Sequence, residues 1–122
     1  MEVRFFRTPA GNEPVRDFIR SFPKEDREVI GTDLKTVQFG WPVGMPICRS
    51  LGSGVHEVRT SLPNRREVRI LFFLSADTVV LVHGFLKKSQ KTPKPDLDLA
   101  LSRKAEFERN VKASAKPRPK TT

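Results

Sequence analysis

The chain has 122 residues, of which 37% are hydrophobic and 30% charged, a balance typical of one globular domain and not of a disordered segment. Its formal net charge is +9, and residues 84–122 contain eleven Lys and Arg against four Asp and Glu, which favours nucleic acid or an acidic protein as partner. The single cysteine excludes an intrachain disulfide, and neither a membrane span nor a signal peptide is recognisable, so we expect a cytoplasmic protein without membrane contact.

The first half of the chain predicts one short strand and two helices. Residues 3–8 read as a strand that Pro9 and Gly11 end, and Asn12 is placed to cap the helix that follows. The inner face of this helix shows the i, i+3, i+4, i+7 spacing and consists of Val15, Phe18, Ile19 and Phe22. A second helix is expected over residues 24–39, with an inner stripe of Ile30, Leu34 and Val37.

The second half predicts an antiparallel meander and a third helix. A Gly- and Pro-rich connector at 41–54 contains one irregular strand around 47–51. Short joints link the strand-like runs that follow, which favours hairpins between 55–60, 66–74 and 78–85. The last helix is expected from 96 to about 112. The predicted class is therefore α+β: an antiparallel sheet with an N-terminal helical hairpin on one face and a C-terminal helix, in a single domain of residues 1–112 with a disordered basic tail at 113–122.

Side-chain alternation assigns the residues of the middle run to two faces of the sheet. The apolar face, which should meet the helical hairpin, consists of Val68, Ile70, Phe72 and Leu74. The other face is expected to be only partly covered and carries Arg69, with Arg59 beside it on the neighbouring strand. Two interpretations stay open for these arginines: ion pairs with Glu57 and Glu67, or the clamping of a phosphate.

Few other residues suggest a catalytic or metal-binding site. The chain has no Gly-rich phosphate loop, no nucleophile elbow and no His, Cys, Asp and Glu set at metal-ligand spacing. Cys48 is expected to be a small buried residue, and His56 and His83 lie in different predicted strands. The remaining candidates are the two strand arginines and the lysines of HGFLKKSQKTPKP, residues 83–95, which follow a buried-looking strand directly.

Four segments resemble the phage-derived Gp49-like branch of the RelE/HigB toxin group. They are HEVR (56–59), VRILFFL (68–74), VLVHGFLKKSQKTPKP (80–95) and the charged helix that follows. The resemblance covers nearly the whole chain, and HGFLKKSQKTP is its most specific part. It implies a RelE-like fold and a type II toxin, an endoribonuclease that cuts mRNA in the ribosomal A site without metal or cofactor. It also implies neutralisation by a helix-turn-helix antitoxin, through which alone the toxin meets operator DNA.

The resemblance also implies roles for individual residues. In an attack of the 2′-OH on the adjacent phosphorus, Arg59 and Arg69 would stabilise phosphoryl charge, Lys87 would position the backbone or help proton transfer, and His83 would serve as acid or base. The expected RNA-binding residues are Arg65, Arg66, Lys88, Lys91 and Lys94.

One departure from the family concerns tyrosine. The chain contains none, and Val68 stands where a tyrosine often precedes the strand arginine, so the resemblance assigns no firm acid and base. Two other classes of function stay open. One is a ParE-like poison of DNA gyrase, against which the basic set argues, and the other is a non-catalytic basic protein that binds nucleic acid.

Overall fold

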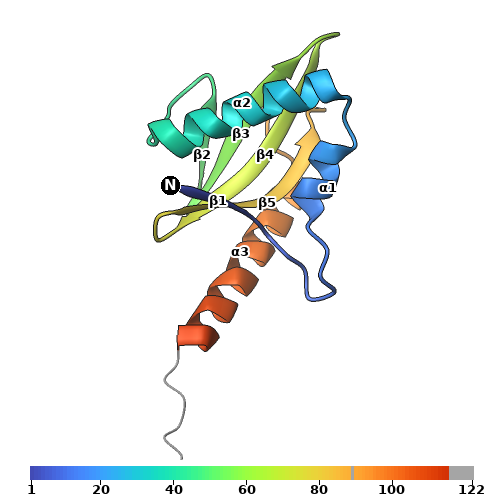
Figure 1. Ribbon diagram of the computed structural model, residues 1–122. Helices are drawn as coiled ribbons and strands as arrows, with labels where there is room; N and C mark the ends of the chain where they lie inside the picture. The colour runs from blue at the N-terminus through green and yellow to red at the C-terminus, as the bar shows by residue number, and fades with distance from the viewer. Residues whose placement is uncertain (89, 116–122) are drawn as a thin grey trace, which may run out of the picture.

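The computed structural model describes residues 1–88 and 90–115. The elements occur in the order β1 (Glu2–Phe5), α1 (Pro14–Arg20), α2 (Lys24–Gly40), β2 (Cys48–Gly52), β3 (Val55–Leu62), β4 (Arg66–Ser75), β5 (Thr78–Leu86) and α3 (Lys94–Ala115). One sheet of five strands has the order β1-β5-β4-β3-β2, with β1 parallel to β5 and all other neighbours antiparallel. Helices α1 and α2 cover one face, and α3 packs against the other (Figure 1). The predicted α+β class and RelE-like architecture are confirmed.

Two apolar clusters, one on each face, hold the helices to the sheet. On the first face Ile30 and Val37 of α2, both predicted for its inner stripe, are fully buried against Ile70 and Phe72 of β4. On the second face Ala100 of α3 packs in a cluster with strand residues that include Leu71, Phe73, Val80 and Val82. Full burial of an apolar side chain of this size contributes about 1.5–3 kcal/mol, so both faces of the sheet contribute to the core.

The start of α1 differs from the prediction. Glu13, not Asn12, is the N-cap residue, and no side chain accepts a hydrogen bond there. Asn12 instead closes the preceding turn, where its N–H donates to Thr8 Oγ1 at 3.1 Å. Pro14 occupies the first helical position, and because proline has no N–H, this helix start lacks one of the donors that a cap would satisfy.

Helix α3 is longer than predicted at both ends. It begins at Lys94 because the Pro93 carbonyl accepts hydrogen bonds from the N–H groups of Asp96 and Leu97, and Pro95 is tolerated in a first turn. Lys94 is therefore helical and does not lie in a loop. The helix continues to Ala115, so the predicted limit at residue 112 falls inside it, and residues 116–122 of the predicted tail lie outside the described residues. No helix within the described ranges is long and apolar enough to cross a membrane.

Strand β5 contains a one-residue bulge at Val82. Phe72 of β4 lies opposite Leu81, whereas the preceding residue Leu71 lies opposite His83, so Val82 has no partner of its own. An extra residue in one strand shifts the alternation of its side chains by one position.

The bulge decides which face of the sheet the side chains after Val82 occupy. Beyond it, Phe85 is the register partner of Arg69 and packs in the α3-side cluster. Gly84 faces the opposite side, where an added Cβ would lie only 2.5 Å from the ring of Phe18. Lys87 has the same parity as Phe85 and is thereby delivered to the Arg69 side of the sheet.

Candidate functional site

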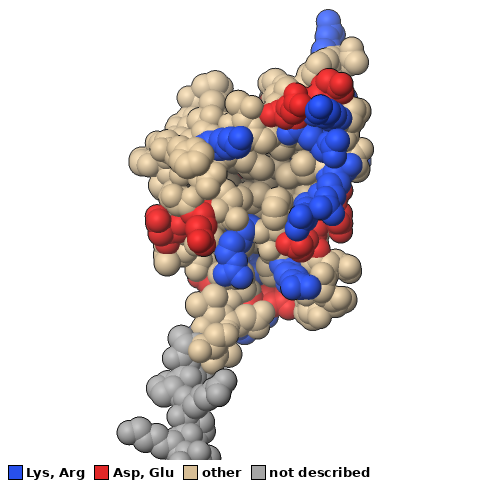
Figure 2. Space-filling view, in the orientation of Figure 1, with Lys and Arg blue, Asp and Glu red and all other residues tan. Residues whose placement is uncertain are grey.

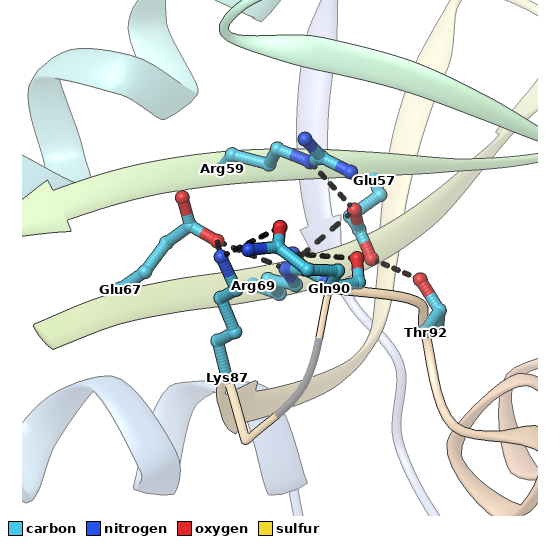
Figure 3. A network of polar contacts seen from close by, with 7 residues as sticks. All are labelled: Glu57, Arg59, Glu67, Arg69, Lys87, Gln90 and Thr92. Carbon is cyan, nitrogen blue, oxygen red and sulfur yellow. Dashed lines mark hydrogen bonds and ion pairs between the residues drawn. The ribbon is translucent and has the colours of Figure 1, made fainter.

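One polar network lies on the α3 side of the sheet, at the end of β3, β4 and β5 that leads into α3 (Figure 3). Arg59 and Arg69 are register partners on neighbouring strands, which confirms that they share a face. The network combines three cations with two carboxylates, and its members are Glu57, Arg59, Glu67, Arg69, Lys87, Gln90 and Thr92.

Arg69 is completely buried, so the expectation of an open face is wrong at this position. Its Nε donates to Glu67 Oε2 at 3.1 Å and its Nη2 donates to the main-chain carbonyl of Gln90 at 3.1 Å. Its Nη1 is buried and has no hydrogen-bond partner in the part of the chain that the structure describes. The segment between β5 and α3 contacts Arg69 through Gln90 and closes the face there, so truncation of Arg69 would leave a cavity that the sequence did not predict.

Arg59 is the more accessible of the two arginines, with 16% of its side chain exposed. Its Nε donates to Glu57 Oε1 at 3.0 Å, and its two terminal nitrogens have no partner among the described residues. An arginine held through Nε keeps both terminal nitrogens for a two-point contact with a phosphate. Of the two arginines, Arg59 is the one placed to meet an anion.

Both arginines are paired with glutamates, so the ion-pair interpretation is realised. Glu57 is fully buried, lies 3.8 Å from Arg69 Nε, and accepts a 2.6 Å hydrogen bond from Thr92 Oγ1. The sequence suggested the glutamates as partners but gave no sign of Thr92 or Gln90. Polar residues after a strand follow no periodic pattern, and only the HGFLKKSQKTPKP segment as a whole marked this region.

An open groove of about 500 Å³ borders the network at the β3–β4 turn. Lys87 is one of its lining residues, with Nζ 3.3 Å from Gln90 Oε1 and 3.8 Å from Glu67 Oε2. Four cations and one carboxylate are among the residues that line it, which are Ser61, Leu62, Arg65, Arg66, Glu67, Lys87, Lys88 and Gln90. This basic groove, defined by those eight residues, suits a phosphate chain better than a neutral ligand.

The side of the molecule that carries α1 and α2 has a different charge pattern. Figure 2, in the orientation of Figure 1, shows Lys and Arg side chains interspersed there with Asp and Glu side chains. Arg66 illustrates the mixing, because its Nη1 lies 2.9 Å from Asp26 Oδ2 at the start of α2 although the residue also lines the basic groove. Positive charge on that side is therefore largely offset by nearby carboxylates.

His83 does not join the network. Its Nε2 lies 2.6 Å from Asp96 Oδ1 in the first turn of α3, and its ring stacks on Phe85, the register partner of Arg69. Lys94 is equally separate, since its Nζ lies 2.7 Å from Asp98 Oδ2 one turn along α3, and this hydrogen bond raises its pKa. Lys91 lies between Gln90 and Thr92 in the segment that joins β5 to α3.

Cys48 is buried, as expected, and His56 also packs in the core. Burial raises the pKa of the Cys48 thiol to about 11, and the nearby Glu57 charge adds to the effect. His56 packs with Trp41 and Phe72, and burial lowers its pKa. Within residues 1–88 and 90–115, no three or more His, Cys, Asp and Glu side chains lie close enough together to hold a metal ion.

Comparison with known protein families gives a match over most of the chain. The family model described as phage derived protein Gp49-like (DUF891) matches residues 17–105, from α1 to the middle of α3. Every residue of the network and of the basic groove falls inside this range. No curated protein matches the chain.

Proposed function

The chain belongs to the phage-derived Gp49-like family, and from that premise we propose that it is the toxin of a type II toxin–antitoxin system and cleaves mRNA on the ribosome. Family membership suggests a toxin with an antitoxin partner. One observation carries the step to RNA cleavage: Arg59 offers two terminal nitrogens next to Arg69, and the Arg69 partner Glu67 lines a groove together with four cations. A groove of that charge takes a polyanion, and a fixed guanidinium beside it takes one phosphate of the chain.

In the proposed reaction the 2′-oxygen of the substrate attacks the adjacent phosphorus. The O2′–P bond forms, the P–O5′ bond breaks, and the products are a 2′,3′-cyclic phosphate and a free 5′-hydroxyl. The proton of the 2′-OH is removed, and the leaving 5′-oxygen gains one. Arg59 stabilises the charge that develops on the non-bridging oxygens, and Lys87 adds a second cation from the groove.

The proton transfers have one candidate in the groove. Lys87 points its ammonium toward Gln90 and Glu67, so it is placed to donate a proton to the leaving oxygen. His83 is held by Asp96 outside the network, and we give it no direct role. Because the chain has no tyrosine, the ribosome is proposed to supply the remaining proton transfer.

The proposed partners follow from the position of the groove. A helix-turn-helix antitoxin would neutralise the protein by covering the basic groove or by keeping it from the ribosomal A site, and would make the contacts to operator DNA. A tight pair of this kind buries roughly 1,200 Å² or more in total. Since the substrate is mRNA on ribosomes, the proposal places the protein in the cytoplasm.

Cleavage of ribosome-bound mRNA by purified protein tests the proposal. Arg59→Ala should reduce the single-turnover rate by about 10²–10³, the usual effect of removing one oxyanion donor. Lys35→Ala, which removes an exposed lysine from α2, is the matched control and should cleave at the parental rate. Circular dichroism at the assay temperature checks that both variants are folded.

Other outcomes would point to other functions. A wild-type protein that leaves mRNA intact but blocks supercoiling by gyrase would be a ParE-like poison. Binding of RNA with no cleavage, on or off the ribosome, would indicate a non-catalytic nucleic-acid-binding protein. Full activity of folded Arg59→Ala would mean that the chemistry lies elsewhere on the molecule.

A further inference from the structure

We propose that Glu57 is a positioning residue: its carboxylate fixes the guanidinium of Arg59, and the hydroxyl of Thr92 holds that carboxylate in place. The consequence for catalysis rests on the proposed function. The geometric part, that Thr92 controls the position of Arg59 through Glu57, stands without it.

The first step in the argument is that Glu57 is wholly buried and yet surrounded by donors. Oε1 accepts the 3.0 Å hydrogen bond from Arg59 Nε and lies 3.8 Å from Arg69 Nε, while Oε2 accepts the 2.6 Å bond from Thr92 Oγ1. A buried carboxylate is costly unless it is paired and hydrogen-bonded, so this arrangement is needed for stability as well as for order.

The three groups that contact Glu57 come from three parts of the fold. Arg59 is on β3 with Glu57 itself, Arg69 is on β4, and Thr92 lies just before α3. A carboxylate approached from three directions has its plane fixed. Glu57 also has neither an exposed atom nor a free oxygen, which excludes it as the base that removes the 2′-OH proton and leaves it a positioning role.

Arg59 needs such a support because its side chain is long and its terminal nitrogens have no partner among the described residues. An unsupported arginine samples many rotamers, and freezing them when the substrate binds costs free energy. With Nε held by Glu57, the direction of the guanidinium plane is set before a phosphate arrives, which is the preorganisation that transition-state stabilisation requires.

Thr92 is the member that ties this support to the lysine-bearing segment. Its 2.6 Å bond is short and charge-assisted, which is the stronger class of hydrogen bond. The same segment carries Lys87 and Gln90, and the Gln90 carbonyl accepts from Arg69 Nη2. The segment and the arginine pair therefore meet at two points, Gln90 with Arg69 and Thr92 with Glu57, as Figure 3 shows.

The test compares Thr92→Val, which removes the hydroxyl at nearly constant shape, with Thr92→Ser, which keeps it. Thr60→Val is the matched control, because Thr60 is a buried threonine whose place on β3 points it to the other face of the sheet. The first measurement is the NMR resonance of the Arg59 Nε–H and its exchange with solvent. Thr92→Val should shift the resonance and speed exchange at least tenfold, whereas Thr92→Ser and Thr60→Val should leave both near the wild-type values.

The second measurement is cleavage of ribosome-bound mRNA as the ribosome concentration is varied. Thr92→Val should lower kcat about tenfold with KM nearly unchanged, since a misdirected guanidinium fails mainly in the transition state. Thr92→Ser should restore kcat. Glu57→Gln, a second variant of the same shape, should disturb the Arg59 resonance in the same way.

Each result decides one part of the proposal. An Arg59 resonance that does not respond to Thr92→Val overturns the positioning role, whether or not the protein cleaves RNA. A shifted resonance with unchanged kcat overturns the catalytic consequence alone. A wild-type protein without cleavage activity refutes the proposed function, and the resonance still decides the geometric part.

Discussion

Arg59 and Arg69 lie opposite each other on neighbouring strands, but their surroundings give them different tasks. Arg69 is enclosed by two carboxylates and a main-chain carbonyl, and its charge is part of the core. Arg59 has one nitrogen bound and two nitrogens directed to no described residue. The pair therefore divides into a structural and a ligand-binding member, a distinction that strand alternation alone does not make.

Truncation should separate these two roles in the free energy of unfolding. Arg69→Ala removes one partner of a buried ion-pair cluster and should cost roughly 3–5 kcal/mol. Arg59→Ala removes one hydrogen bond from buried Glu57 and should cost only about 1–2 kcal/mol. Urea titration followed by circular dichroism measures both, and equal losses for the two variants would contradict the assignment.

The sequence predicted the face of Arg69 but not its burial, and the reason lies in another element. Alternation along a strand tells which residues share a face, and it does not tell what covers that face. The sequence did indicate cover for part of this face, because Leu97, Ala100 and Leu101 of α3 have the spacing of one helical face and pack in the α3-side cluster. That stripe accounts for the burial of Leu71 and Phe73, whereas Arg69 is contacted by Gln90, which belongs to a segment without a periodic pattern.

At the scale of elements, each helix and strand that the sequence predicted is present, and the differences lie at the ends and in the bulge. The hairpins followed from short joints, and the inner stripe of α2 followed from its spacing. The bulge in β5 had no comparable signal, because Val79, Val80, Leu81 and Val82 are all apolar and either register buries them. Gly84 was the available hint, since a glycine inside a strand often marks a bulge or a close approach.

Two glycine substitutions should have opposite effects on stability. In Gly84→Ala the new Cβ would lie 2.5 Å from Phe18 Cδ2 and 2.9 Å from Cε2, so the ring must shift, at a cost of about 1–3 kcal/mol. Gly31→Ala, inside α2, meets no atom within 4 Å and should stabilise the protein by about 0.5–1 kcal/mol. Thermal unfolding of both variants gives the comparison, and an unchanged Gly84→Ala would mean that Phe18 repacks freely.

At the scale of the whole molecule, the net charge of +9 is unevenly distributed, and only part of it is placed to bind RNA. Carboxylates intersperse the cations on the α1–α2 side, whereas the basic groove sets four cations against one carboxylate. The net charge drives long-range attraction to RNA, and the groove decides where the chain is held. Composition alone predicted the attraction to RNA. The position of the groove could be seen only in the fold, because Arg65 and Lys88 come from different turns of the chain.

The salt dependence of binding should report which lysines contact phosphate. Lys88→Ala should reduce the slope of log K against log salt by about 0.7–1, the contribution of one phosphate contact. Lys35→Ala changes the net charge equally but should leave the slope near the wild-type value. Fluorescence anisotropy with a labelled single-stranded RNA between low and moderate salt measures both slopes. Equal slopes for the two variants would mean that RNA does not follow the basic groove.

The bulge at Val82 also limits how this protein can change by insertion and deletion. Val80 and the bulge residue Val82, and after them His83 and Phe85, all face α3, although the two pairs have opposite parity. In strand β5, even-numbered residues therefore face α3 up to Val82, and odd-numbered residues face α3 after it. Removing Val82 would put the strand in one phase and leave His83 opposite Leu71, with Lys87 still on the Arg69 side. Removing Leu86 instead would turn Lys87 away from Arg69 and bring Lys88 to its place. The number of residues between the bulge and the lysines that follow β5 therefore determines which ammonium group lies beside the arginines.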